Sequence, residues 1–231
     1  MVFLVSLPAP IVPTVFKGVA AALNCSVNAT PTPPTNATHQ WPPSTPKGFN
    51  MTTSNIPDDY TLQLDQAAMD AAKLDLGDGA VTPGYGPWRD AIVSLLNGAL
   101  ATELVCVLRY KRHHFTAHGL SSPKIAEEFM VHAREETAHA DMLAERIVQL
   151  GGDPDFSPDT LLQRSHAAYD TSSELKAMLR ANLVAERVAV ETYRQMIALI
   201  GDKDPTTRRM LESILSEEEE HADELKDMLA E

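Results

Sequence analysis

Apolar residues recur at spacings of three and four over most of residues 88–231, which is the period of amphipathic α-helices. Four long segments carry this pattern, and they lie at about 88–119, 123–150, 173–200 and 204–231. Gly119, Gly151 and Gly201 follow the first three segments, as is typical of helix ends. The links after the first and third segments are short, and the link after the second is longer, with room for one helical turn. The pattern predicts an all-α, up-down four-helix bundle with one long crossover.

The chain before these helices divides into two parts. Nine of the sixteen prolines fall in residues 1–50, so we predict a Pro/Thr-rich leader at 1–58 that is disordered or removed. Residues 59–87 are expected to form a short helix, at about 60–76, and a Gly/Pro linker. Residues 88–231 form the bundle.

The apolar start of the chain leaves two alternatives open. It could serve as a signal peptide, but no basic residue precedes its apolar part, and Pro8, Pro10 and Pro13 interrupt it. Alternatively, Met51 is the natural start of the protein. We predict a cytoplasmic protein.

Charge narrows the range of partners. The formal net charge is −13, and residues 51–231 contain all 32 acidic residues but only 17 basic ones. This balance disfavours nucleic acid and anionic membranes and suits a cationic partner. No apolar run of about 18 residues is evident, so no membrane span is expected. Two cysteines make no disulfide framework, and Cys106 is interpreted as a small core residue.

Each helical segment places a glutamate in the middle of its apolar stripe, and two segments add a histidine three residues later. One such glutamate alone would be interpreted as a solvated residue at the stripe's edge. Four carboxylates inside one bundle would each cost several kcal/mol unless they are protonated or bind cations. Residues i and i+3 share a helix face, so each Glu-x-x-His pair can contact one metal ion. Two divalent first-row metals therefore fit this set: Glu103, Glu136, His139, Glu186, Glu218 and His221.

The pattern also repeats within the chain. Tyr110 follows Glu103 by seven residues, as Tyr193 follows Glu186. The next helix in each half then carries Glu-x-x-His-Ala-Asp, at 136–141 and at 218–223. The two halves thus resemble a repeated helical hairpin around one metal site.

With these motifs, residues 88–229 resemble the ferritin-like superfamily, and within it the bacterioferritin-like diiron proteins. The matching stretches are Leu-Asn-Gly-Ala-Leu-Ala-Thr-Glu at 96–103, Glu-Glu-Thr-Ala-His-Ala-Asp at 135–141, Leu-Val-Ala-Glu at 183–186 and Glu-Glu-Glu-Glu-His at 217–221. The resemblance implies two iron ions per subunit, with manganese as an alternative metal. It implies Glu103 and Glu186 as terminal ligands, Glu136 and Glu218 as bridges, and one ion each for His139 and His221. Tyr110 would be the outer tyrosine that donates an electron.

The function that this resemblance implies is ferroxidase and iron storage, in which Fe(II) is oxidised by O2 or H2O2. A diiron or dimanganese peroxidase or catalase would use the same ligands and remains an alternative. A DNA-protecting protein of the starvation-induced (Dps) type is less favoured, because Lys17 and Lys47 make no basic tail. A protein tethered to a larger shell by its leader is a further alternative without specific support.

Two departures from the bacterioferritin pattern carry expectations of their own. Thr137 stands where bacterioferritins have the haem-binding methionine, so no haem is predicted. Only ten residues follow His221, which leaves no room for the fifth helix of 24-subunit cages. We therefore expect a homo-oligomer of twelve subunits or fewer.

Several polar residues near the predicted site have plainer interpretations. His132 is either a third iron contact or a hydrogen-bonded core residue. In the acidic run 217–220 only Glu218 is expected to bind metal, and the other three are interpreted as a solvated face. His113, His114 and His118 would offset the dipole at the end of their helix.

Overall fold

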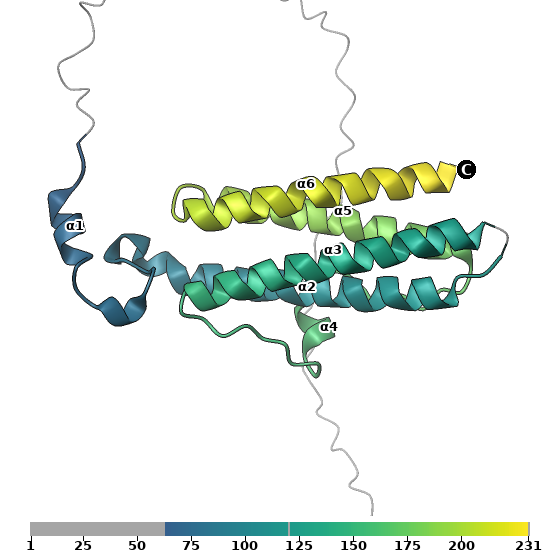
Figure 1. Cartoon of the computed structure of the whole chain (residues 1–231), viewed down its shortest axis with the longest axis horizontal. Coiled ribbons are helices and arrows are strands. Elements are labelled where there is room, and N and C mark those ends of the chain that lie inside the picture. The colour runs from purple at the N-terminus through teal and green to yellow at the C-terminus, as the bar shows by residue number, and fades with distance from the viewer. Residues whose placement is uncertain (1–62, 120, 231) are drawn as a thin grey trace, which may run out of the picture. The chain divides into compact units, whose positions relative to one another are not determined.

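The structure is a computed structural model that describes residues 63–119 and 121–230, and all regular secondary structure in these residues is helical (Figure 1). The four long helices are α2 (Arg89–Thr116), α3 (Ser122–Gln149), α5 (Leu175–Ile200) and α6 (Pro205–Ala230). The expected all-α four-helix bundle is confirmed, and each helix begins and ends within three residues of its predicted bounds. The leader predicted at 1–58 lies outside the described residues.

Helix ends follow the glycine and proline signals. Gly151 and Gly201 adopt φ values of +74° and +51° directly after α3 and α5, in the left-handed region that glycine tolerates best. Pro205 is the first residue of α6, where its missing N–H costs nothing. Asp204 caps this helix by accepting a hydrogen bond from the Thr207 backbone N–H at 2.9 Å.

The helices pair as two hairpins, α2 with α3 and α5 with α6, and further contacts join α2 to α5 and α3 to α6 (Figure 1). The connection from α3 to α5 contains the one-turn helix α4 (Leu161–Arg164). It runs along α2: Asn97 bonds to the backbone at Asp153 and Asp155, and Arg112 donates to the carbonyls of residues 171 and 172 at 2.8 Å. The crossover thus spans the length of α2, and the single helical turn expected in it is present.

Two large apolar clusters fill the bundle, and a small third one joins α2 to α4. One contains Leu96, Leu143 and Ile200, and the other contains Phe129, Leu179 and Leu225. On every long helix the predicted metal ligands fall between residues of the first cluster and residues of the second. The polar layer is therefore enclosed by apolar packing from both ends.

The segment before α2 differs from the prediction. Helix α1 covers only Gln66–Ala71, instead of about 60–76, and none of its residues is buried. Two 3-10 helices follow, η1 (Leu76–Asp78) and η2 (Pro83–Trp88). Leu74 and Leu76 remain 67% and 82% exposed, so the apolar stripe predicted here lacks the tertiary contacts that would extend the helix.

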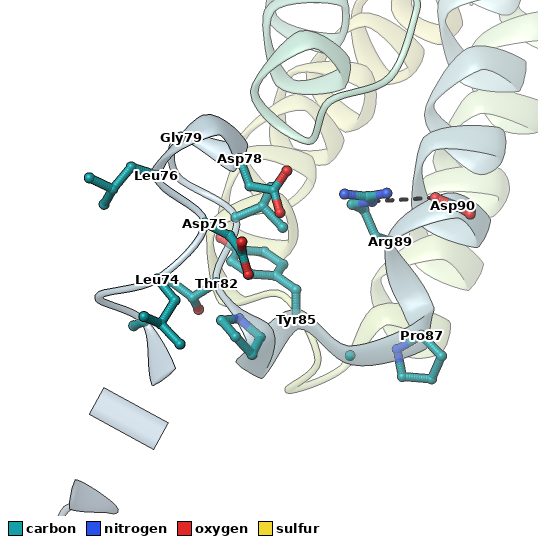
Figure 2. Close-up of a pocket in the computed structure, with 14 residues that line it drawn as sticks. Leu74, Asp75, Leu76, Asp78, Gly79, Thr82, Tyr85, Pro87, Arg89 and Asp90 are labelled. Carbon is teal, nitrogen blue, oxygen red and sulfur yellow. Dashed lines mark hydrogen bonds and ion pairs between the residues drawn. The ribbon is translucent and has the colours of Figure 1, made fainter. Parts of the chain in front are cut away.

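A pocket of about 270 Å³ lies within this segment. Figure 2 shows Asp75, Asp78 and Tyr85 around it, with Arg89 paired to Asp90 at 3.4 Å. None of the six predicted metal ligands lines this pocket. It is a feature of the linker, separate from the polar layer of the bundle.

The premise of the expectation about membrane spans, that no long apolar run exists, needs correction. The stretch Pro83–Thr116, which contains α2, includes an 18-residue window with a mean hydropathy of 2.0, so by length and composition it could cross a membrane. In the structure 56% of that window is buried, and α2 packs against α3, α4 and α5. Its hydropathy is accounted for by its place as a core helix.

Candidate metal centre

The six predicted ligands lie together in the middle of the bundle, and none is more than 4% exposed. Helix α2 contributes Glu103 and helix α5 contributes Glu186. Helices α3 and α6 each contribute a Glu-x-x-His pair, Glu136 with His139 and Glu218 with His221. The spacing of three holds because residues i and i+3 lie on one helix face, here the face that points into the bundle.

The donor atoms form two overlapping groups. In each group, one ligand atom per residue lies within 4.8 Å of all the others. The groups are Glu103, Glu136, His139 and Glu218, and Glu136, Glu186, Glu218 and His221. Glu136 and Glu218 belong to both, which is the arrangement that bridging ligands of a two-metal site require.

Unsatisfied polar atoms at the centre fit bound cations. Glu136 Oε1, Glu186 Oε2, both carboxylate oxygens of Glu218 and His221 Nδ1 are buried and have no hydrogen-bond partner. His139 Nδ1 lies 3.2 Å from Glu136 Oε2 and 3.1 Å from Glu218 Oε1. Buried acceptors that face one another in this way are costly unless protons or metal ions lie between them. Carboxylate and imidazole donors suit divalent first-row metals.

Each ligand histidine forms a hydrogen bond through its outer nitrogen to a further glutamate, and one of these glutamates, Glu217, was expected to be solvated. His139 Nε2 bonds to Glu217 at 3.0 Å, and His221 Nε2 bonds to Glu135 at 3.0 Å. In the neutral ring, a carboxylate fixes the proton on the nitrogen that it contacts, so the Nδ1 lone pair is directed toward the centre and can bind a metal ion. The signal was present in the sequence, because a glutamate stands directly before Glu136 and before Glu218.

Two tyrosines form hydrogen bonds to Glu103 and Glu186, and each tyrosine lies on the helix opposite to the glutamate that it contacts. The Tyr110 hydroxyl on α2 donates to Glu186 on α5, and the Tyr193 hydroxyl on α5 donates to Glu103 on α2. Burial, and then the charge of the neighbouring glutamate, raise the pKa of both tyrosines well above the usual value, so both remain donors. The repeat in the sequence thus corresponds to a repeated set of contacts.

The pKa values indicate protons that a metal would displace. Burial, together with the charge of Glu136, raises the pKa of Glu103 and of Glu218 well above the usual value. Burial alone would also raise the pKa of Glu136, but the contacts with His139 and His221 outweigh it and lower that pKa. For His221, the negative charge of Glu136 outweighs burial and raises the pKa to about 9. In the absence of metal, protons therefore partly neutralise the layer.

A buried cation lies beside this layer on one side. Arg109 is 1% exposed, donates to Asn182 Oδ1 at 2.7 Å, and reaches within 3.8 Å of Glu186. Asn182 also contacts His113, which bonds to Asp170 at 3.1 Å. His113 is thus part of a buried polar chain rather than a free charge at the end of α2. The buried position of Arg109 was not predicted, because two of its hydrogen-bond acceptors, Asn182 and the Ala168 carbonyl, lie on other segments.

Two other expected roles can be compared with the structure. Cys106 is buried as expected, and its sulfur accepts a hydrogen bond from Arg109 at 3.4 Å. His132 is buried and bonded to Tyr110 and Glu224, at 3.1 and 3.0 Å. Of the two interpretations given for His132, a hydrogen-bonded core residue describes these contacts.

Comparison with known proteins gives a consistent assignment. The chain is 33% identical over 138 residues to a nutrient stress-induced DNA-binding protein of Synechococcus sp., covering 58% of this chain and 78% of that protein. It is 26% identical to a bacterioferritin of Desulfovibrio desulfuricans, covering 56% and 69% of the two chains. A solved dodecameric thioferritin, described as the bacterioferritin-related protein of Bacteroides fragilis, matches with a TM-score of 0.60 and 31% identity over 62% of this chain and 86% of that one. The family model of the ferritin-like domain matches residues 93–231, and the chain therefore belongs to the ferritin-like family.

Proposed function

We propose that this protein is a ferroxidase that oxidises Fe(II) to Fe(III) at a two-iron centre within each subunit. The observation that supports it best is the pair of ligand groups that share Glu136 and Glu218 and leave buried oxygens unsatisfied. Membership of the ferritin-like family supports iron as the metal. The bacterioferritin name of several relatives points the same way.

In this proposal each side chain has a definite role. Glu103 and Glu186 are terminal ligands, Glu136 and Glu218 bridge, and His139 and His221 bind one ion each through Nδ1. Glu135 and Glu217 hold the two imidazoles, and Tyr193 and Tyr110 hold the terminal carboxylates. Hard carboxylate oxygens stabilise Fe(III) relative to Fe(II), which favours oxidation.

The electron balance is simple. Two Fe(II) substrate ions supply two electrons, which with two protons convert O2 to H2O2 or convert H2O2 to two water molecules. Tyr110 would supply a further electron when fewer iron electrons are available. The protons displaced by metal from the carboxylates and imidazoles of the layer leave as iron binds.

Anaerobic Fe(II) titration, followed by addition of O2 or H2O2, tests the proposal. We expect two Fe(II) per chain and rapid ferric absorbance in the near ultraviolet, both lost in Glu136→Ala/His139→Ala. The matched control is Glu219→Ala/Glu220→Ala, because these two acids are exposed on α6 beside Glu218. Absence of stoichiometric Fe(II) binding in the wild type would exclude this function. Release of O2 from H2O2 by the manganese-loaded protein would favour the catalase alternative.

The assembly that we propose is a homo-oligomer of twelve subunits or fewer, and the similarity to the dodecameric thioferritin of Bacteroides fragilis supports this size. Light scattering on the purified protein measures it directly. Thr137 is exposed and its hydroxyl donates to the Ala133 carbonyl at 2.7 Å, and we propose that no haem binds at this position. The pyridine haemochrome spectrum of the protein checks this expectation.

A DNA-binding role is the second candidate, because the Synechococcus relative bears that name. The formal charge of −13 argues against it, since contacts to phosphates supply most non-specific affinity for DNA. A gel-shift assay at low salt separates the two: retardation of plasmid DNA would support the DNA-binding role, and we expect none.

A further inference from the structure

A second polar cluster lies one helical turn away from the candidate metal centre. It consists of His132 and Glu128 on α3 and Glu224 on α6, the two helices that carry the Glu-x-x-His pairs (Figure 1). His132 Nε2 lies 3.0 Å from Glu224 Oε2 and 3.8 Å from Glu128 Oε1. One ligand atom from each residue lies within 4.8 Å of the other two.

The hydrogen bonds of Tyr110 determine which nitrogen of His132 carries a proton. The single proton of the Tyr110 hydroxyl is donated to Glu186, so the hydroxyl oxygen is left as an acceptor for His132 Nδ1 at 3.1 Å. His132 Nδ1 must therefore carry a proton. In the neutral ring, Nε2 then has only a lone pair, and this lone pair faces two carboxylates. Either a proton on Nε2 or a metal ion can lie between these three groups, and the positions of the donor atoms fit both.

The orientation of His132 is the reverse of that of the two ligand histidines. His139 and His221 turn Nε2 to an outer acid and Nδ1 to the centre, whereas His132 turns Nδ1 inward and Nε2 outward. Its acceptors are also more accessible. The His132 side chain is fully buried, but the side chains of Glu128 and Glu224 are 28% and 42% exposed. The cluster has a buried imidazole at its base and a solvent-facing rim.

The cluster is in direct contact with one half of the centre. The rings of His132 and His221 stack with centroids 4.3 Å apart and planes inclined by 20°. His132, Glu135 and His221 also offer ligand atoms within 4.8 Å of one another. A cation at the cluster would thus lie next to the half of the centre that contains His221.

We propose that Glu128, His132 and Glu224 form a separate site for a divalent first-row metal ion, from which Fe(II) is passed to the His221 half of the centre. Its donor set of one imidazole and two carboxylates suits the same metals as the centre. The imidazole is preorganised by Tyr110, and the exposed rim gives hydrated ions access. The delivery role rests on the proposed ferroxidase function, whereas the binding of the metal does not.

Isothermal titration calorimetry with Co(II) under anaerobic conditions counts the bound ions and so separates the two sites. We expect three Co(II) ions per chain in the wild type and two in Glu128→Gln/Glu224→Gln. The double variant Glu136→Gln/Glu218→Gln, which removes both bridging carboxylates, should retain one. Glu219→Gln/Glu220→Gln is the matched control on the exposed face of α6 and should retain three. Anomalous scattering from cobalt-soaked crystals would show the third ion beside His132 Nε2.

The outcomes distinguish this inference from the proposed function. Two ions in both the wild type and Glu128→Gln/Glu224→Gln, with no anomalous peak at His132, would overturn the inference and leave the two-metal centre intact. If the wild type binds a single ion, and only Glu128→Gln/Glu224→Gln abolishes that binding, the outer site would be supported and the two-metal centre overturned. For delivery, we expect Glu128→Gln/Glu224→Gln to slow the initial rate of Fe(II) oxidation by about tenfold at limiting iron, as for other residues that support a metal site. An unchanged rate would exclude delivery through this site.

Discussion

Two groups of buried charged residues lie along the contact between α3 and α6, and they differ in whether their charges and hydrogen-bonding groups are satisfied. Near the start of α6, Arg146 donates to both oxygens of Asp204 at 2.9 and 2.8 Å and to the Thr207 hydroxyl at 2.8 Å. Asp204 is fully buried and also caps α6. This junction, which we call the Arg146 junction, contains one positive and one negative charge with their hydrogen-bonding groups satisfied.

The metal centre, in the middle of the same helices, is left incomplete. Four carboxylates converge there, and five buried side-chain atoms of its residues have no hydrogen-bond partner. The difference separates a structural role from a functional one. A satisfied ion pair stabilises the fold by itself, whereas an excess of buried acceptors requires something that the chain does not supply. If this distinction is correct, substitutions at the two places should differ in sign, in metal dependence and in pH dependence.

The largest effect is expected from Arg146→Met, which leaves Asp204 buried without its partner. Removing one member of a buried pair costs about 3–5 kcal/mol in the free energy of unfolding. Denaturant titration of the metal-free protein measures this loss. Arg146→Met/Asp204→Asn should recover most of it, because asparagine keeps the helix cap and removes the charge.

Arg164→Met is the matched control for that experiment. The pair that Arg164 forms with Asp155 at 3.1 Å is partly exposed, so its loss should cost at most about 1 kcal/mol. Equal losses in the two arginine variants would show that burial does not distinguish the Arg146 junction.

The second largest effect is stabilisation by metal. Any ligand that binds only the folded state at a hundred times its Kd adds about 2.7 kcal/mol to the free energy of unfolding. We expect this gain with Co(II) under anaerobic conditions in the wild type and in Arg146→Met, and a smaller gain in Glu136→Ala/His139→Ala, in which only the outer site of Glu128, His132 and Glu224 could still bind the ion. A gain that depends on Arg146 would mean that the two places are not independent.

The third prediction concerns pH, because burial raises the pKa of Glu218 in the folded protein. A raised pKa means that the folded state holds its proton more tightly, so stability is present below the unfolded pKa of about 4.3 and is lost as the pH rises through the folded pKa. The loss is at most about 1.4 kcal/mol per pH unit for one proton. Glu218→Gln should therefore match the metal-free wild type at acid pH and exceed its stability above neutral pH.

Urea titrations of both proteins from pH 4 to pH 8 test this difference, with pH steps of about one unit resolving the slope. Asp204→Asn should behave in the opposite way. Burial opposes ionisation of Asp204, but the hydrogen bonds from Thr207 and Arg146 outweigh it and lower its pKa. Wild-type stability at that site is thus lost as the pH falls. A Glu218→Gln variant that is less stable than the wild type at every pH would contradict the account of the centre.

The contrast also explains which features the sequence could predict. The spacing of three and four placed Glu103, Glu136, Glu186 and Glu218 on buried stripes, because helix geometry alone determines that relation. Arg109 and Arg146 are buried because acceptors on other helices or loops satisfy them, and a single helical period contains no such information. The helix predicted at about 60–76 was too long for the same reason, since no residue of α1 is buried against another element.

Glu135 and Glu217, which form hydrogen bonds to the ligand histidines, could be predicted only in part. Glu135 and Glu217 are only partly buried, so a stripe analysis assigns them to the solvated face. Their equivalent positions in the two halves of the repeat were visible, but the contact of each with the histidine of the opposite helix required the packing of α3 against α6.

The smallest effect is expected within the centre itself, from its two tyrosines. Tyr193→Phe removes one hydrogen bond, to Glu103, and Tyr110→Phe removes two, to Glu186 and from His132. At about 1 kcal/mol per hydrogen bond, Tyr110→Phe should destabilise the protein by about 1 kcal/mol more than Tyr193→Phe. Thermal unfolding of the metal-free variants measures this difference.

Electron donation provides a second comparison of the two tyrosines, because it does not depend on stability. Only Tyr110 also contacts His132, so its hydroxyl oxygen accepts a second hydrogen bond that stabilises it when its proton passes to Glu186. Freeze-quenched oxidation at substoichiometric Fe(II) should give a tyrosyl radical signal by electron paramagnetic resonance in the wild type and in Tyr193→Phe, and none in Tyr110→Phe. A radical that persists in Tyr110→Phe and disappears in Tyr193→Phe would identify Tyr193 as the electron donor instead. The asymmetry at His132 would then have no part in oxidation.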